Sequence, residues 1–325
     1  MARRTGEPTM LDILAITTPI FLLMGIGYVA RWGGIIQREQ LQGVGVFVLY
    51  CALPALVIRA LTQQPLSDIF QPSYLLAYGL GSLFVLCAGL VLCWKLQRQP
   101  LNASAMQALG MTASNSGFVG YPVAAMVIGS PAAVLLALNM LVENLLIIPA
   151  ALILAEMGNQ QGSNVWQTLR QTARNLAKNP LLIGLTVGVV IAGTGIDMPL
   201  PIEKAIHMLA EAAGPAALFV IGGSLFGLRA QGMMRDVGQI VVGKLLLHPL
   251  AILVACLLVP SIEPVYMAGA LLFAAAPMIS IYPLLGQRYH LGDVSAAAML
   301  VATVASFFTL SLLIWLMTLS DLVAF

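Results

Sequence analysis

The stretch ASNSGFVGYP at residues 113–122 interrupts an apolar run that extends from about residue 104 to residue 129. It places an amide, two hydroxyls, two glycines and a proline where a membrane-spanning helix should be most apolar. Pro122 lacks an N–H and clashes with the preceding turn, whereas Gly117 and Gly120 let the backbone unwind at low steric cost. In lipid, backbone freed in this way is tolerated only where protein buries it or where it lines a polar cavity. The stretch therefore predicts a broken membrane helix, a feature that often marks a solute-binding site.

A second break is predicted at residues 276–283, APMISIYP, which contains Pro277 and Pro283 and ends in the same Tyr-Pro pair. Each break should leave a half-helix whose free N-terminus carries about half a positive charge and unpaired N–H groups. Two such ends that meet at mid-membrane would form an anion site without a full positive charge. Neutral donors for this site would be Ser114, Asn115, Ser116 and Ser280. Two kinked structural helices whose polar groups satisfy each other are the alternative.

The composition is that of an integral membrane protein. Of 325 residues, 60% are hydrophobic and only 9% are charged, against about 25% charged residues in a soluble domain. The net charge of +2 identifies no partner, and no nucleic acid is expected. The four cysteines have neither metal-type spacing nor the pattern of a disulfide framework, so we interpret them as small core residues and expect no metal.

Ten membrane spans are predicted from apolar segments of about 20 residues. They lie near residues 12–30, 43–62, 73–94, 104–129, 131–155, 180–196, 204–227, 237–259, 265–288 and 293–320. The polar stretch at residues 156–178 divides them into five and five. We therefore predict a first five-helix repeat at 1–155, a cytoplasmic linker at 156–178 and a second five-helix repeat at 179–325.

An internal repeat supports this division. A shift of 161 residues places three prolines on three others without a gap: Pro19 on Pro180, Pro54 on Pro215 and Pro122 on Pro283. An odd number of spans per unit means that the two halves enter the membrane from opposite sides, as inverted-topology repeats do. The predicted fold is an all-α integral membrane protein with ten transmembrane helices in a 5+5 inverted repeat, in which discontinuous helices four and nine cross.

The distribution of positive charge predicts the orientation. The connections on one side carry ten Lys or Arg residues, namely Arg31, Arg38, Lys95, Arg98, Arg170, Arg174, Lys178, Arg229, Arg235 and Arg288. The other side carries four, namely Arg3, Arg4, Arg59 and Lys204. This asymmetry places both termini outside and the linker in the cytoplasm.

Three ionisable residues inside predicted spans are candidates for ion coupling. Glu143 lies near the middle of span five, where a carboxylate costs about 2.5–3.5 kcal/mol on insertion scales. It would either couple transport to a proton or cation, or only hold helices together. Lys244 and His248 lie four residues apart in span eight and so share one face. Lys244 would pair with Glu143, attract an anion, or extend toward the cytoplasmic surface.

Two further pairs of residues carry weaker signals. Pro54 and Pro215 are predicted to break spans two and seven, either for packing or for ligand contact. His207 and Glu211 lie near the outer surface, where we interpret them as a solvated or structural pair.

Enzyme motifs are largely missing. Gly222-Gly223-Ser224 resembles an intramembrane serine-protease elbow, but Leu225 stands where a glycine is expected. Small residues at a helix–helix contact explain this stretch better. We therefore predict no catalytic residue and no cofactor.

The chain resembles the auxin efflux carrier family over essentially its whole length. The residues that carry the resemblance are Asn115, Gly120 and Pro122 in span four, Pro277 and Pro283 in span nine, and Pro54 in span two. The prokaryotic branch of this family includes proteins assigned as malonate and malate permeases.

The resemblance implies a fold like that of bile acid:sodium symporters and crossover-type sodium/proton antiporters. Spans one, two, six and seven would form a scaffold. Two copies of the chain could form a homodimer through this scaffold. Spans three to five and eight to ten would form a moving transport unit. The substrate carboxylate would sit under the crossing near Asn115, faced by Val57 of span two and Asn144 of span five.

Two departures from the plant carriers bear on the substrate. Their long cytoplasmic loop is reduced here to residues 156–178, and Glu143 and Asn144 stand where those carriers have aromatic residues. Both favour a small organic anion such as malonate or malate in a bacterial inner membrane. We predict a secondary carrier that works by alternating access, with proton or sodium coupling. An intramembrane enzyme and a membrane-embedded anion sensor remain the alternatives.

Overall fold

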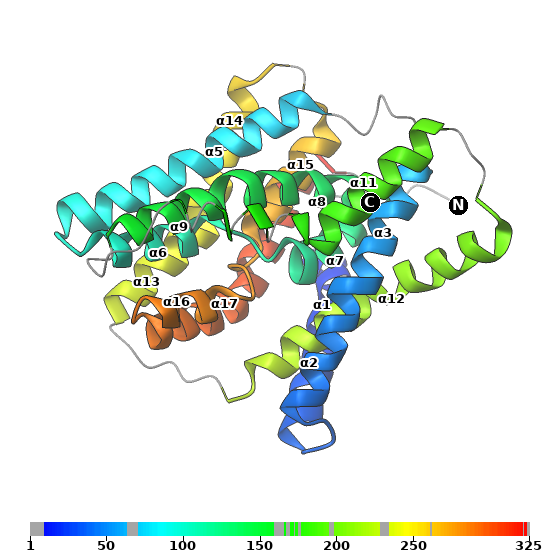
Figure 1. Cartoon of the computed structure of the whole chain (residues 1–325), viewed down its shortest axis with the longest axis horizontal. Helices are drawn as coiled ribbons and strands as arrows, with labels where there is room; N and C mark the ends of the chain where they lie inside the picture. Colours follow the sequence, from blue (N-terminus) through cyan, green and yellow to red (C-terminus); the bar gives the residue numbers. More distant parts are fainter. Residues whose placement is uncertain are drawn as a thin grey trace.

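The computed structural model describes residues 10–63, 71–158, 166, 170–171, 173–174, 177–194, 198–227, 234–260, 262–320 and 322–323. Within these ranges the regular elements are helical (Figure 1). The first half contains α1 (Met10–Trp32), α2 (Arg38–Phe47), η1 (Val48–Ala52), α3 (Leu53–Thr62), α5 (Pro72–Leu90), η2 (Val91–Leu96), α6 (Leu101–Thr112), η3 (Ser116–Gly120), α7 (Tyr121–Ile128), α8 (Pro131–Val142), η4 (Glu143–Ile147) and α9 (Ile148–Met157). The second half contains α11 (Pro180–Thr194), α12 (Leu200–Leu225), α13 (Met234–Val242), η5 (Gly243–Leu247), α14 (His248–Leu258), α15 (Pro264–Ala275), α16 (Tyr282–Arg288) and α17 (Gly292–Leu319).

Several of these helices are long and apolar enough to cross a membrane, which makes the chain a multi-pass membrane protein. Among the described residues six segments qualify: Arg38–Thr62, Pro72–Leu96, Pro131–Met157, Leu200–Leu225, Met234–Leu258 and Gly292–Leu319. The interrupted segments are shorter, because α6 and α15 each end at a break and α7 follows one. Each of the ten predicted ranges overlaps at least one of the described helices, but ten crossings and the 5+5 repeat stay predictions.

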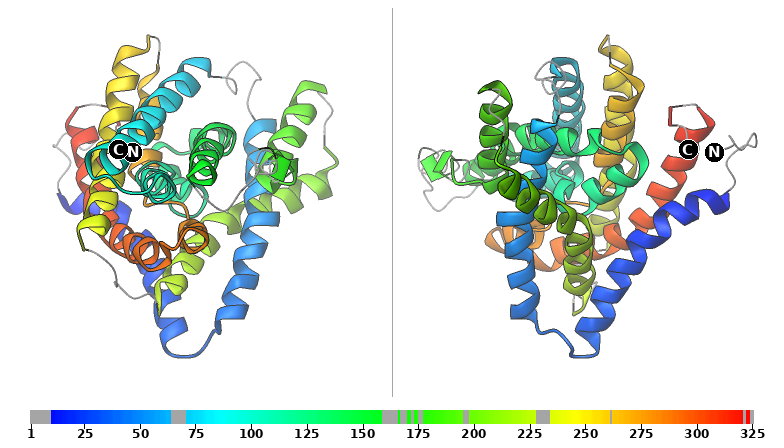
Figure 2. Two further views of the ribbon diagram at one scale, coloured as in Figure 1. Left: turned by 60° about the vertical axis from the view of Figure 1, so that its left-hand side comes forward. Right: turned by 90° about the vertical axis from the view of Figure 1, so that its right-hand side faces the viewer.

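The helices pack in two groups. In the first group, α12 lies against α1, α2 and α3, and α11 lies against α3. In the second group, α5 and α9 pack on α6, α14 packs on α5 and α15, and α17 packs on α13 and α16. The groups meet where α1 contacts α7 and α17 and where α3 and α11 contact α8. Figure 2 shows α1 and α2 reaching beyond the second group at the bottom of both views.

Widened helical turns precede four of the prolines in the chain. The π-helical turns η1, η3, η4 and η5 each run directly into a helix with proline at its second position, namely Pro54, Pro122, Pro149 and Pro249. A proline ring clashes with the carbonyl four residues earlier and cannot donate to it. A turn with i→i+5 spacing moves that carbonyl and lets the helix continue.

The prediction that Pro54 and Pro215 break their spans is therefore wrong. The segment Arg38–Thr62 is helical throughout, because η1 accommodates Pro54. α12 likewise continues through Pro215. There the preceding residue is Gly214, which lacks the Cβ that would clash with the proline ring.

Glycines allow α1 and α12 to approach at backbone distance. A Cβ on Gly222 would clash with the Met24 carbonyl oxygen, and a Cβ on Gly27 would clash with the Phe219 carbonyl oxygen. Small residues at such a contact are typical of helix packing in membranes. This packing accounts for the glycines beside Ser224, whose hydroxyl donates to the Ile221 carbonyl oxygen at 2.7 Å.

We predict that Gly222→Leu destabilises the protein, because its side chain would have to displace the backbone of α1. The expected loss is about 1–3 kcal/mol, the usual cost of overpacking. Gly25→Ala is the matched control, because a Cβ on Gly25 meets nothing within 4 Å. Thermal unfolding in detergent measures both variants. Equal midpoints for Gly222→Leu and the wild type would contradict the close approach of α1 and α12.

Candidate functional site

The two breaks meet in a short antiparallel pairing. α6 ends at Thr112 and α15 at Ala275, and Ser114 then lies opposite Met278 in an isolated antiparallel bridge. The Asn115 N–H donates to the Pro277 carbonyl oxygen at 2.8 Å. The Ile279 N–H donates to the Ala113 carbonyl oxygen at 3.2 Å. The crossing thus pairs backbone groups that would otherwise be left unsatisfied in the interior.

Asn115 starts the second half-helix. Its side-chain Oδ1 accepts from the Phe118 N–H at 3.3 Å, and its carbonyl oxygen accepts from the N–H groups of Val119 and Gly120. Asn115 is only 5% exposed. Gly120 is required by packing here, because a Cβ on it would lie 2.7 Å from the Phe273 ring.

Glu143 reaches the crossing from η4. Its side chain is buried, and Oε1 accepts from the Ser114 N–H and from the Ser116 hydroxyl, each at 3.0 Å. Its second oxygen, Oε2, is buried and has no hydrogen-bond partner among the described residues. A carboxylate therefore sits at the positive end of the second half-helix, with one oxygen engaged and the other unengaged.

Lys244 reaches the crossing from η5 on the opposite helix. Its Nζ donates to the Ser114 hydroxyl at 2.6 Å, to the Ala274 carbonyl oxygen at 3.0 Å and to the Thr112 carbonyl oxygen at 3.2 Å. Thr112 and Ala274 lie in the last turns of α6 and α15, so the ammonium occupies the negative ends of two helices. Its side chain is fully buried, so it does not extend to the surface.

Ser114 links the two charged residues. Its N–H donates to Glu143, and its hydroxyl oxygen accepts from Lys244. Among the described residues Glu143 and Lys244 make no direct ion pair, and Ser114 bonds to both of them. Their pairing stays a prediction. The hydroxyls of Ser114 and Ser116, predicted as anion donors, are engaged by these two side chains.

His248 extends the network away from the crossing. Its Nδ1 lies 2.8 Å from Lys244 Nζ, and its Nε2 lies 3.0 Å from the Ser82 hydroxyl. A charged Lys244 has three N–H groups for four neighbours, namely the Ser114 hydroxyl, the two carbonyl oxygens and His248 Nδ1, so one N–H is shared between two acceptors. Because an ammonium can only donate, the imidazole Nδ1 would then accept and Nε2–H would face Ser82.

α5 supplies polar residues that the sequence interpretation missed. The Tyr78 hydroxyl lies 3.4 Å from the Ser114 hydroxyl, and the Tyr74 hydroxyl donates to Asn139 Oδ1 at 2.8 Å. Their spacing is the sequence pattern that could have identified them. Tyr74, Tyr78 and Ser82 recur every four residues and so share one face of an apolar helix.

Four other predicted site residues lie on α3, on η4, in the second break and on α16. Ser280 Oγ is buried without a hydrogen-bond partner among the described residues. Val57 is fully buried in α3. The Asn144 side-chain amide donates to the Met140 carbonyl oxygen at 2.9 Å and accepts from Asn179 Nδ2 at 3.3 Å. Pro283 is the second residue of α16. The substrate-binding roles of Asn115, Ser280, Val57 and Asn144 stay predictions.

The motifs that would serve an enzyme or a metal site are not assembled. Ser224 and His248 bond to different partners, namely the Ile221 carbonyl oxygen for Ser224 and Lys244 with Ser82 for His248. His207 lies 3.9 Å from Glu203 and 3.1 Å from Gln63, whereas Glu211 approaches Arg59 at 4.0 Å. Within the described ranges no group of three or more His, Cys, Asp or Glu could hold a metal ion.

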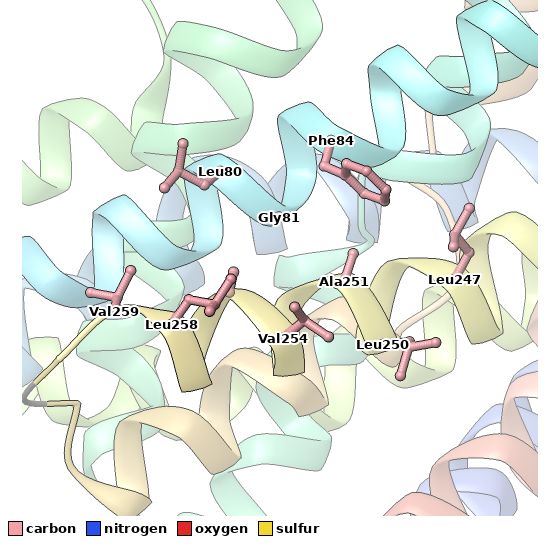
Figure 3. A pocket seen from close by; sticks show the side chains of 10 residues that line it. Leu80, Gly81, Phe84, Leu247, Leu250, Ala251, Val254, Leu258 and Val259 are labelled. Carbon is pink, nitrogen blue, oxygen red and sulfur yellow. The ribbon is translucent and has the colours of Figure 1, made fainter.

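A groove between α5 and α14 is an unsuitable anion site. It measures about 550 Å³ and is lined by apolar residues such as Leu80, Phe84, Leu250, Val254 and Leu258 (Figure 3). A carboxylate placed there would lose its hydration without gaining a hydrogen bond.

Comparison with known proteins decides the family. The model of the family described as "Membrane transport protein" (Mem_trans) matches residues 13–316. The chain belongs to this family. It is the auxin efflux carrier family that the sequence resembles.

Two curated proteins are similar to this transport protein. The first, from Rhizobium meliloti (strain 1021), is described as "Putative malonate transporter" and is 28% identical over 311 residues, which cover 94% of this chain and 96% of that protein. The second, the "Lysosomal cholesterol signaling protein" of Mus musculus, is 24% identical over 239 residues, which cover 69% of this chain but only 27% of that protein.

We predict that Lys244→Met costs less stability when Glu143 is already neutral. In the wild-type background the change leaves a buried carboxylate without the nearby positive charge and leaves two helix-end carbonyls without a donor. The expected cost is about 3–5 kcal/mol. In Glu143→Gln, where the amide oxygen still accepts from Ser114 and Ser116, the cost should fall by about 1–3 kcal/mol. Thermal unfolding of the wild type, both single variants and the double variant gives a double-mutant cycle, which measures the coupling of the two residues. An identical cost in both backgrounds would show that the two residues are not coupled.

Proposed function

We propose that this transport protein is a secondary carrier for a small organic anion, mono- or dicarboxylic, that works by alternating access. The observation that supports this proposal best is the crossing of two interrupted helices, whose backbones pair at Ser114 and Met278. At this crossing Ser114 bonds to both Glu143 and Lys244. Interrupted helices at membrane depth provide helix ends that can bind a charged solute.

The anion would bind at the start of the second half-helix. Asn115 and the N–H groups that follow it lie at a helix N-terminus, which favours negative charge. Ser280 Oγ adds an unengaged hydroxyl from the other break. The name of the Rhizobium relative makes malonate the first substrate to test, and malate extends the test to a second dicarboxylate.

The two groups of helices are the proposed scaffold and transport unit. α1, α2–α3, α11 and α12 would stay fixed, and the helices from α5 to α9 and from α13 to α17 would move. The contacts support an inverted repeat: Gly27 packs on Phe219, and Gly188 packs on Ile58. The 161-residue shift relates Gly27 to Gly188 and Ile58 to Phe219. We place the carrier in a bacterial inner membrane with both termini outside, and a homodimer would form through the scaffold.

Glu143 is the proposed coupling residue, with a proton as the coupling ion. Its Oε2 is unengaged and can take up a proton, while Oε1 keeps its bonds to the crossing. Sodium is the second alternative. It would need backbone carbonyls and hydroxyls as ligands, and Lys244 already donates to the carbonyls of Thr112 and Ala274 and to the Ser114 hydroxyl.

The rival functions predict other outcomes. An intramembrane enzyme would lose its activity in Ser224→Ala, whereas a carrier would keep transport in that variant. A membrane sensor would bind malonate without moving it. The family and the Rhizobium relative are transporters, which favours the carrier.

We predict that Asn115→Ala combined with Pro122→Ala abolishes uptake of radiolabelled malonate and malate into proteoliposomes. The double change removes the cap of η3 and the proline that η3 accommodates. Asn102→Ala, at the opposite end of α6, is the control and should keep transport. Unchanged uptake by the double variant would count decisively against the crossing as the site.

We predict that Glu143→Gln removes the pH dependence of transport, because a neutral amide cannot exchange the coupling proton. Uptake is measured at several external pH values and again with choline in place of sodium. Glu156→Gln changes another buried carboxylate of the same helical segment, one that pairs with Arg288 away from the crossing, and should keep the dependence. A full pH dependence in Glu143→Gln would exclude the coupling role.

A further inference from the structure

A groove of about 440 Å³ opens between α3 and the α7–α8 hairpin. α3 contributes Arg59, and Gln63 follows at the C-terminal end of this helix. α7 contributes Tyr121, and the turn before α8 contributes Gly129 and Ser130. We call this space the interunit groove, because α3 belongs to the first group of helices and α7 and α8 to the second. In the proposed carrier it would lie on the boundary that changes during transport.

The interunit groove reaches the half-helix that starts at the crossing. Tyr121, which lines it, is the first residue of α7 and directly follows η3. η3 in turn is capped by Asn115. A solute in the groove therefore contacts the same helix whose N-terminus is the proposed anion site.

Arg59 gives the interunit groove a positive charge. It is the only charged residue among the described residues that line the groove. Its one acidic neighbour in the described residues is Glu211, at 4.0 Å from Nη1 with a side chain that is 71% exposed. An exposed ion pair of this length contributes little. The guanidinium is thus available to a carboxylate, whose two oxygens match its planar fork.

The turn opposite Arg59 adds donors of the right kind. Gly129 has a φ of 70°, in the left-handed region, and the chain then enters α8 through Ser130 and Pro131. The Ser130 hydroxyl makes no capping bond to α8. A hydroxyl at the positive end of a twelve-residue helix reinforces the preference of the groove for an anion.

We infer that the interunit groove is the anion vestibule of this carrier, in which Arg59 binds a carboxylate of the substrate before the crossing does. The inference rests on the proposed function and adds to it a binding residue outside the crossing. It also distinguishes this groove from the one between α5 and α14, whose lining offers a carboxylate no partner.

Transport kinetics test the role of Arg59. In proteoliposomes, Arg59→Gln should raise KM for malonate and malate about 10- to 100-fold, as expected for the loss of a charged hydrogen-bond pair. Arg59→Lys should fall between the wild type and Arg59→Gln, because an ammonium keeps the charge but not the fork. The readout separates binding from folding, since KM should change much more than kcat.

Two matched variants separate anion binding by Arg59 from its ion pair with Glu211 and from the general positive charge of this surface. Glu211→Gln removes the ion pair without touching the guanidinium, and Lys204→Gln removes a positive charge of α12 that does not line the groove. Both should keep KM within about twofold, since exposed pairs contribute little. If Glu211→Gln raised KM as much as Arg59→Gln, Arg59 would only hold α3 against α12, and the inference would be overturned.

A labelling experiment tests the groove with Arg59 in place. In a variant without the four native cysteines, Ser130→Cys should react with an anionic thiosulfonate, and malonate should slow this reaction. The same Ser130→Cys chain with Arg59→Gln should lose the protection. Unchanged labelling in a chain that still transports malonate would overturn the inference alone. If the wild type transported neither malonate nor malate, the proposed function itself would fail.

Discussion

The pairing of two interrupted helices is the interaction on which the rest of the structure depends. Each break frees backbone donors and acceptors in the interior of a membrane protein, where an unsatisfied group costs several kcal/mol. The bonds from Asn115 to Pro277 and from Ile279 to Ala113 satisfy one break with the other. Neither break could be tolerated alone. The carbonyl oxygens of Thr112 and Ala274 take no part in this pairing, and the Lys244 ammonium donates to both of them.

Widened turns decide which side chains arrive at this pairing. Glu143 is the first residue of η4 and Lys244 the second of η5, and both turns precede a helix with proline at its second position. A π-helical turn adds a residue without adding a turn, and so it shifts the faces that the flanking helical segments present. Both charged residues therefore occupy places where the local helix departs from the regular spacing. Departures of this kind often lie at functional sites.

Local sequence could specify the breaks and the helical ranges, because proline, glycine and apolar runs act on the backbone where they stand. The two Tyr-Pro stretches are breaks for this reason. Pro54 and Pro215 show the limit of the rule, since a preceding wide turn or glycine lets a helix continue through a proline. The spacing of Lys244 and His248 indicates their contact, but the carbonyl partners of Lys244 could not be predicted. Thr112 and Ala274 contribute carbonyl oxygens, which every residue has and no sequence pattern reveals.

The charges at the crossing also explain why a proton and an anion would move together in the proposed carrier. With Glu143 ionised, its charge balances that of Lys244, and the polar cluster is neutral overall. Protonation of Glu143 leaves the ammonium and the helix N-terminus at Asn115 uncompensated, so a carboxylate restores the balance. A transport unit with no net charge crosses the low-dielectric interior at the least cost. Arg59 lies on the helices proposed to stay fixed, so it can attract the anion without adding its charge to the unit that moves.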